Sequence, residues 1–195
     1  MELSVLSDDF VPTNHAGKYA ELLNLYNWQE KAIDDLSDNI WNEYYMTVAI
    51  VNALLPRMEN IKPKDEEDRL EMENIRSEAK ALKAMCYFDL LRLYGPVYSE
   101  ANLSKDGIIL KHRLELDFLP RSSLKDCADE IEKLLTDALK ADNSDAEVFY
   151  LSTPAVKALL AEFELYRGNY DEAVSYGLPL LDGAESRWTK AEYDN

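Results

Sequence analysis

Apolar residues recur every three or four positions in two long stretches of this chain, the spacing of a helix that turns one face toward a core. The first stretch runs from Asn39 to about Asn60, and the second from about Arg69 to Tyr94. In the first, the apolar stripe consists of Ile40, Tyr44, Val48, Val51 and Leu55. The charged segment 60–73 leads from one stretch into the other. The pattern therefore predicts a helical hairpin.

The second of these helices is apolar on more than one side, so we expect it to pack against neighbours on two sides. One line consists of Ile75, Ala79, Leu82, Cys86, Leu90 and Leu93, and the other of Ala81, Met85 and Phe88. Asp89 and Arg92 are three positions apart and can pair with each other or reach an adjacent helix. Gly95 is expected in the left-handed conformation that ends helices, and Pro96 prevents continuation.

The periodicity is interrupted on both sides of this hairpin. Residues 1–36 are polar and mixed, with a loop at 7–15 and enough apolar residues around Leu22 for one or two helical turns. Residues 96–121 alternate weakly and predict a long loop or a short hairpin. Helix resumes after Ser123, which can cap the next helix. Its buried stripe is predicted to be Leu124, Cys127, Ala128, Ile131, Leu134, Leu135 and Ala138.

The last third of the chain has the pattern of a tetratricopeptide-like helical hairpin. Thr153 is predicted as the cap of an apolar helix, with Pro154 at its first position. Gly168 then marks the turn, and Asn169 can cap a second helix. The small and large residues around this turn alternate as they do where two such helices cross closely. The fold class we predict is all-α, built from tetratricopeptide-like hairpins in an α-α superhelix.

Composition narrows the functional classes. The 195 residues include 38 acidic and 21 basic ones, a formal charge of −17, which repels nucleic acid and anionic lipid. Six glycines leave little room for a glycine-rich phosphate loop. Cys86 and Cys127 form no metal-binding pair and are expected to be small buried side chains. No apolar run is long enough for a membrane span, and no export signal is visible at the start.

No sequence motif of a catalytic site is present. The two histidines, His15 and His112, lie in predicted loops. Acidic pairs at 8–9 and 34–35 resemble calcium ligands or glycosidase carboxylates, but such pairs arise freely in so acidic a chain. We therefore expect no catalytic residues, no metal site and no cofactor.

Aromatic residues offer the only candidates for ligand contacts, because sugar rings stack on exposed aromatic faces. Tyr26 and Trp28 precede the first long helix and fit a sugar platform and a buried position equally well. Trp41 lies in the helical stripe and is expected in the core.

The segment SEAKALKAMCYFDLLRLYG, residues 77–95, resembles the signature of the SusD/RagB family of outer-membrane nutrient-binding lipoproteins. The matching positions are Glu78, Ala79, Leu82, Ala84, Tyr87, Phe88, Asp89, Leu90, Arg92, Tyr94 and Gly95. Three other segments resemble the family in the same order: the helix containing Trp41 and Asn52, residues 119–139, and the hairpin around Gly168. Lys83 replaces the commoner arginine.

This resemblance implies a binding protein and not an enzyme. Family members hold an oligosaccharide or another nutrient at the cell surface and work with a TonB-dependent SusC-like outer-membrane transporter. They are surface-facing lipoproteins, held to the outer membrane by a lipid anchor that this sequence does not contain. The chain resembles their N-terminal helical part, so we expect residues 1–195 to form one helical domain of a longer architecture. Asp89 and Arg92 are then expected to hold neighbouring helices together.

Two other classes remain open. A tetratricopeptide-type adaptor would bind a protein partner without binding a glycan. A carbohydrate-active or metal-dependent enzyme would need converging polar residues, and no such group is visible in the sequence.

Overall fold

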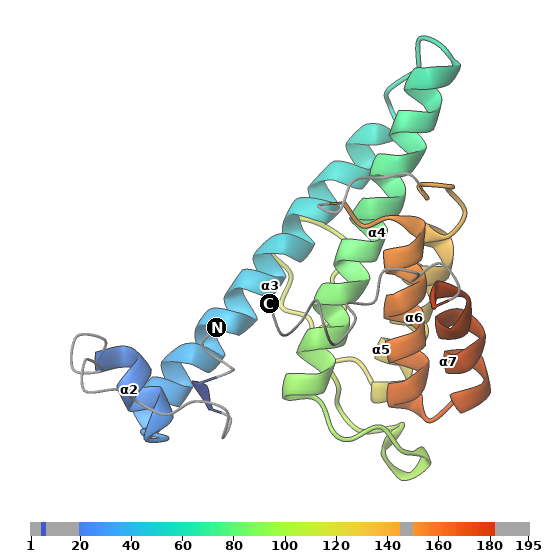
Figure 1. The fold of residues 1–195 in the computed structure, drawn as a ribbon. Helices are drawn as coiled ribbons and strands as arrows, with labels where there is room; N and C mark the ends of the chain where they lie inside the picture. Colours follow the sequence, from blue (N-terminus) through green and yellow to red (C-terminus); the bar gives the residue numbers. More distant parts are fainter. Residues whose placement is uncertain (1–4, 7–19, 145–149, 182–195) are drawn as a thin grey trace, which may run out of the picture. The chain divides into compact units, whose positions relative to one another are not determined.

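The computed structural model describes residues 5–6, 20–144 and 150–181, and its regular elements are helices. No strand is present among these residues, which confirms the all-α prediction (Figure 1). The helices are α2 (Ala20–Tyr26), α3 (Glu30–Met58), α4 (Glu66–Tyr94), α5 (Leu124–Ala138), α6 (Thr153–Arg167) and α7 (Tyr170–Gly177), with short 3-10 turns η2 (Glu100–Asn102) and η3 (Leu178–Leu180). The chain divides into two compact units, Met1–Met46 and Thr47–Asn195.

The core of the second unit is centred on α4, which packs against α5 and α6, while α6 packs against α7. Ala79, Ala81 and Ala84 are buried and keep the surface of α4 small where other helices approach. This confirms that α4 is covered on more than one side. Ile75 and Leu93, at the ends of one predicted line, are exposed, although Met72 and Leu91 near them are buried.

Both long helices begin earlier than the periodicity predicts. Helix α3 begins at Glu30, nine residues before Asn39. Ile33 and the buried Leu36 continue the apolar stripe toward that start, but the predicted range left them out. Helix α4 begins at Glu66, where the side chain of Asp65 accepts a hydrogen bond from the backbone N–H of Asp68. Neither helix, nor any other in the described ranges, combines the length and apolar composition needed to cross a membrane.

Helix α5 agrees with its prediction. The hydroxyl of Ser123 accepts a hydrogen bond from the backbone N–H of Asp126, which satisfies one of the free N–H groups at the helix start. Its buried residues are the predicted ones: Leu124, Cys127, Ala128, Ile131, Leu134, Leu135 and Ala138. One continuous stripe of apolar residues was therefore sufficient to orient this helix.

The last hairpin turns where predicted, but its caps differ. Gly168 has a φ of 83°, the left-handed conformation that glycine adopts most readily. The cap of α6 is Ser152 and not Thr153, whose hydroxyl instead accepts a hydrogen bond from the backbone N–H of Asn143. Asn169 occupies the cap position of α7, but its side chain donates to Glu164 on α6.

The prediction of a left-handed Gly95 is wrong. This residue is extended, with φ −96° and ψ 168°, and its N–H donates to the carbonyl oxygen of Leu91. A glycine is required there for another reason, because a Cβ atom would lie 2.6 Å from that same oxygen. The backbone at the end of α4 therefore leaves no space for a side chain at position 95.

Residues 96–121 form a long loop, and the optional short strands do not form. The loop contains η2 and is closed at its base by a single antiparallel bridge between Asp106 and Ser123. Gly107 and Ser122 share in this closure, since the N–H of Gly107 donates to Ser122 and that of Ser122 to Ile108. The tip of the loop, residues 112–120, is exposed.

Candidate functional site

The turn between α2 and α3 contains the two aromatic residues predicted as ligand contacts. Tyr26 ends α2 and is half-buried, whereas the side chain of Trp28 in the turn is 62% exposed. Among the residues that the structure describes, Trp28 is also the one non-glycine residue with a positive φ, 53°. The structure therefore separates two candidates that the sequence left equivalent.

The backbone of this turn forms a Schellman motif, a common way to end a helix. The N–H of Trp28 donates to the carbonyl oxygen of Leu25, and the N–H of Gln29 donates to that of Asn24. The left-handed position of this motif is usually a glycine. Here it is a tryptophan, and the sequence gives no sign of this because glycine or asparagine is the signal normally used to find such turns.

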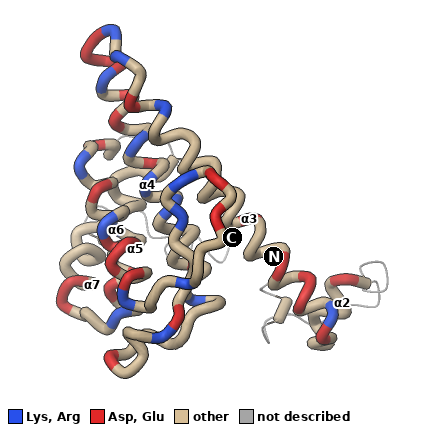
Figure 2. Tube along the Cα trace, turned by 180° about the vertical axis from the view of Figure 1, so that it is seen from behind, with Lys and Arg blue, Asp and Glu red and all other residues tan. Residues whose placement is uncertain are grey.

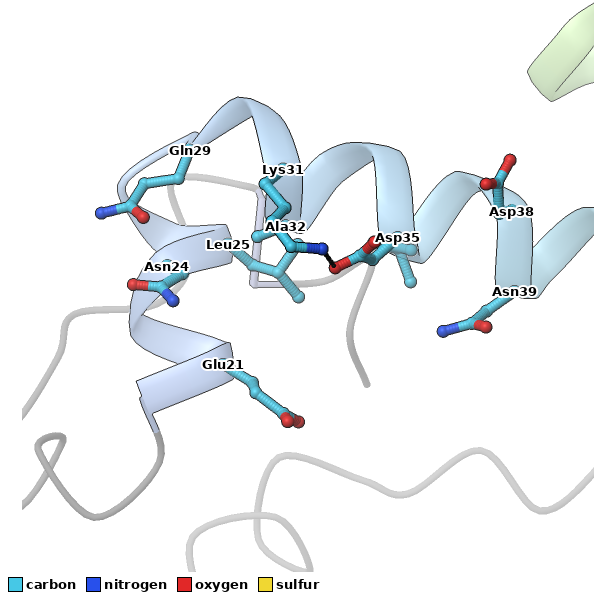
Figure 3. A pocket seen from close by; sticks show the side chains of 10 residues that line it. Glu21, Asn24, Leu25, Gln29, Lys31, Ala32, Asp35, Asp38 and Asn39 are labelled. Carbon is cyan, nitrogen blue, oxygen red and sulfur yellow. Dashed lines mark hydrogen bonds and ion pairs between the residues drawn. The ribbon is translucent and has the colours of Figure 1, made fainter.

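A pocket of about 560 Å³ lies beside this turn, between α2 and the first turns of α3 (Figure 3). Its described lining is mostly polar: Glu21, Asn24, Leu25, Gln29, Lys31, Ala32, Asp35, Leu36, Asp38 and Asn39. The volume lies within the range of about 300–1,000 Å³ that is usual for ligand pockets. Of these residues, Asp35 was singled out in the sequence as part of an acidic pair, whereas the other polar side chains, about one helical turn apart, look like an ordinary solvated face.

The charges on this pocket are mainly negative. Glu21, Asp35 and Asp38 contribute carboxylates, and Lys31 contributes the cation among the described lining residues. Lys31 donates a hydrogen bond to Asp35 at 2.6 Å, an exposed contact that raises the pKa of the lysine. The three amide side chains, Asn24, Gln29 and Asn39, add groups that can both donate and accept hydrogen bonds.

Trp41 is not in the core, contrary to expectation. It is half-buried on α3, and its ring lies 4.8 Å from that of Tyr45 in a tilted arrangement. The spacing of the α3 stripe suggested a buried position, but the described neighbours cover this part of the helix only partly.

The signature residues near the end of α4 connect this helix to α6. Arg92 donates to Glu162 of α6 at 2.5 Å and to Asp89 of its own helix. Its guanidinium carbon lies 4.5 Å from the centre of the Phe88 ring. These contacts agree with the expected structural role of Asp89 and Arg92.

Phe88 belongs to an aromatic cluster beneath this ion pair. It is 2% exposed and meets Phe163 and Tyr166 of α6 edge to face, at 5.3 and 5.4 Å between ring centres. Tyr98 from the following loop lies 5.6 Å from Tyr166. The cluster therefore joins α4, α6 and the start of the long loop.

A second group of signature residues attaches the long loop to α3 and α4. Lys83, 4% exposed, donates to the side-chain oxygen of Asn52 at 2.7 Å. Asn52 donates to the carbonyl oxygen of Lys111, and the Tyr87 hydroxyl both donates to that oxygen and accepts from the N–H of Lys111. Burial lowers the pKa of Lys83. Sequence analysis did not predict this buried lysine, because the position appeared only as a substitution for arginine.

The remaining signature residues also contact protein. Glu78 accepts a hydrogen bond from Asn143 at 2.8 Å, which ties α4 to the segment after α5. Glu164, next to the Gly168 turn, is buried and accepts from Arg167 and Asn169. These residues hold helices together and do not meet at a common cavity.

The described ranges contain no group of three or more His, Cys, Asp or Glu side chains that could hold a metal ion. Both cysteines are buried, as expected, and burial raises the pKa of the Cys86 thiol to about 11. His112 is exposed, 3.6 Å from Glu130. Asp34 and Asp35 lie at the start of α3, while His15, Trp188 and the acidic pair at 8–9 are outside the described residues.

Comparison with solved structures shows what this fold is similar to. A putative sugar-binding protein from Bacteroides vulgatus is 24% identical, with a TM-score of 0.73 over 96% of this chain and 41% of the other. A laminarin-binding SusD-like protein is 20% identical, with a TM-score of 0.67 over 97% and 39%. A structure solved with a xylogluco-oligosaccharide is 18% identical, with a TM-score of 0.65 over 93% and 35%. The chain thus spans about two fifths or less of each of these proteins.

None of the curated proteins compared with the chain matches it. The family model that describes starch-binding proteins associating with the outer membrane matches residues 1–165, which includes the signature helix, α5 and most of α6. The chain therefore belongs to the SusD-like family.

Proposed function

We propose that this chain is the helical part of a carbohydrate-binding protein that captures oligosaccharides for uptake across the outer membrane. The match of residues 1–165 to a family of starch-binding proteins carries this proposal. Structural similarity to a laminarin-binding protein and to a protein solved with a xylogluco-oligosaccharide supports it. In this proposal residues 1–195 act as one helical domain and bind without catalysing a reaction.

The proposal includes a location and a partner. The family is described as associating with the outer membrane. We infer a surface-facing lipoprotein that works with a TonB-dependent SusC-like transporter, which receives the captured oligosaccharide. The strongly negative charge of the chain is consistent with association through an anchor and a protein partner, since an acidic surface is repelled by anionic lipid.

Purification of the native protein from outer membranes tests the partner and the location. We expect a large β-barrel transporter to co-purify in stoichiometric amount and to be identified by its mass. Recovery of the protein from the soluble fraction, with no such partner, would contradict the outer-membrane proposal.

Exposed apolar residues on the last helix favour a second candidate function, a protein-binding adaptor. Tyr170, Val174 and Leu178 are four positions apart and exposed, so they lie on one face of α7 and its extension η3. Such a face is typical of helical-repeat proteins that bind other proteins. If mutation of all three residues to serine leaves glycan binding unchanged, glycan binding does not depend on this face of the helix, and the carbohydrate function is distinct from the adaptor function.

A further inference from the structure

The stability of the fold does not account for an exposed tryptophan at position 28. A tryptophan in the left-handed position of a Schellman motif is strained, because its Cβ atom crowds the following backbone. Burial of the ring could offset that strain, but the side chain is 62% exposed. A strained and exposed aromatic side chain is a feature of sites that meet a ligand.

The pocket next to this tryptophan offers the groups that hydroxyl-rich molecules need. Trp28 is not itself a lining residue, but it directly precedes Gln29, which is one, and consecutive Cα atoms lie about 3.8 Å apart, so Trp28 lies next to the edge of the pocket. Asn24, Gln29 and Asn39 can donate to and accept from hydroxyl groups. The carboxylates can accept charge-assisted hydrogen bonds from them. Figure 3 shows that these side chains come from α2, from the turn and from the first part of α3.

The charge of the pocket limits which glycans fit. Three carboxylates face one ammonium group among the described lining residues, and Lys31 is already paired with Asp35. Acidic residues also predominate on the chain as a whole, where they are spread over several helices (Figure 2). Among the described lining residues, a uronate or sulfate group would meet like charges and the lysine that is already paired with Asp35, which costs binding free energy.

We propose that the pocket between α2 and α3 binds an uncharged oligosaccharide, with Trp28 as the aromatic surface on which one sugar ring stacks. This inference rests on the proposed carbohydrate function and adds to it a site and a ligand class. Selectivity arises from the carboxylates, which accept hydroxyl hydrogens and repel anionic sugars. Trp28 contributes the apolar contact that amides and carboxylates cannot provide.

The test measures affinities of the chain for neutral gluco-, xylo- and manno-oligosaccharides, oligogalacturonates and chitosan oligosaccharides. Trp28→Gly removes the ring and also relieves the backbone strain, so this variant is expected to fold at least as stably as the parent. Its matched control is Phe118→Gly, which removes an exposed aromatic ring from the long loop. A second variant carries Glu21→Lys and Asp38→Lys, and its control carries Glu115→Lys and Asp117→Lys, an equal change of charge on that loop.

We expect a neutral oligosaccharide to bind best, and Trp28→Gly to weaken it about tenfold while the unfolding midpoint stays or rises. The Glu21→Lys and Asp38→Lys variant should gain affinity for oligogalacturonate, and neither control should change binding. Preference of the parent chain for oligogalacturonate or chitosan would overturn the inferred ligand class. Neutral-glycan binding that is unchanged in both site variants would overturn the site and leave the proposed function intact. Failure to bind any of these glycans would overturn the proposed function as well.

Discussion

Among single residues, Trp28 and Lys83 depart clearly from the environments that are usual for their types. Trp28 has a backbone conformation that normally belongs to glycine. Lys83 is a charged side chain inside a helical core, where such residues are rare unless they have a partner. Trp28 lies beside the candidate pocket, whereas Lys83 helps to hold the long loop. We therefore relate the unusual environment of Trp28 to ligand binding and that of Lys83 to the stability of the fold.

Replacing Trp28 by glycine is expected to stabilise the protein by about 1 kcal/mol, since the left-handed conformation costs a bulky residue about 1–2 kcal/mol and glycine recovers it less its own backbone entropy. Chemical denaturation of the parent and the variant measures this difference. Trp28→Ala is the control, because alanine removes the ring but keeps the Cβ atom. A loss of stability in the glycine variant would mean that the ring itself contributes to the fold.

Replacing Lys83 by methionine is expected to alter how stability changes with pH. Burial lowers the pKa of Lys83 from its ordinary value of 10.5, so the unfolded chain binds more protons than the folded one at pH values just below 10.5. Stability contributed by this residue therefore rises with pH through that window.

The measurement compares the free energy of unfolding of Lys83→Met and the parent between neutral pH and pH 10. The parent should gain relative to the variant as the pH rises. At neutral pH the variant should be less stable by about 1–3 kcal/mol, because Asn52 loses its buried hydrogen-bond donor. A difference that does not vary with pH would contradict the lowered pKa.

At the scale of elements, α4 is the helix on which the second unit is assembled. Its buried residues meet α5 and α6, and its last turns bring together the aromatic cluster and the Arg92 ion pairs. Phe88 and Phe163 are buried, whereas the side chains of Arg92 and Glu162 are 41% and 50% exposed. From their burial, we therefore expect neighbouring signature residues to contribute very differently to the free energy of unfolding.

Phe88→Ala is expected to destabilise the protein by about 3–5 kcal/mol, the usual cost of deleting a buried phenylalanine. It removes the edge-to-face contacts with Phe163 and Tyr166 and leaves a cavity between α4 and α6. Thermal denaturation followed by circular dichroism measures the loss. A cost below that of an exposed control, Leu116→Ala, would contradict the central position of this cluster.

Asp89→Ala is expected to cost about 1 kcal/mol, because partly exposed ion pairs contribute little. The variant should bind oligosaccharide as the parent does, since Asp89 contacts Arg92 within the scaffold and does not line the pocket. Melting curves measured beside binding curves separate the two effects. Affinity that falls while stability is preserved would show that the residue acts on the ligand.

At the scale of the whole molecule, the formal charge of −17 is the dominant feature. Such an excess of like charge opposes the folded state by self-repulsion. We expect stability to rise with salt, as the Debye length falls from about 30 Å at 10 mM to about 8 Å at 150 mM. Unfolding midpoints measured in sodium chloride test this. A fall with salt would mean that surface ion pairs, such as those of Arg69 with Glu66 and Glu73, outweigh the repulsion.

The sequence by itself determined the features that depend on neighbours in the chain. The stripe of α5 and its Ser123 cap, the Gly168 turn and the two-sided α4 follow from local spacing, and they are enough to fix an all-α fold. The family signature added the expectation that Asp89 and Arg92 hold helices together, which is supported by the contact of Arg92 with Glu162 of α6 and by its pairing with Asp89. The start of α3 was predicted too late, because residues up to 36 were interpreted as a mixed polar segment although Ile33 and the buried Leu36 continue the apolar stripe.

Only the tertiary structure decided features that depend on residues far apart in the sequence or on backbone conformation. Lys83 and Asn52 are 31 positions apart, so no local pattern predicts that they meet in the core. Gly95 is fixed by the tight approach of Leu91 and not by a left-handed turn. The strained backbone of Trp28 becomes visible only in the folded turn between α2 and α3. The pocket beside it also forms only there, because in the sequence its polar residues look like an ordinary solvated surface.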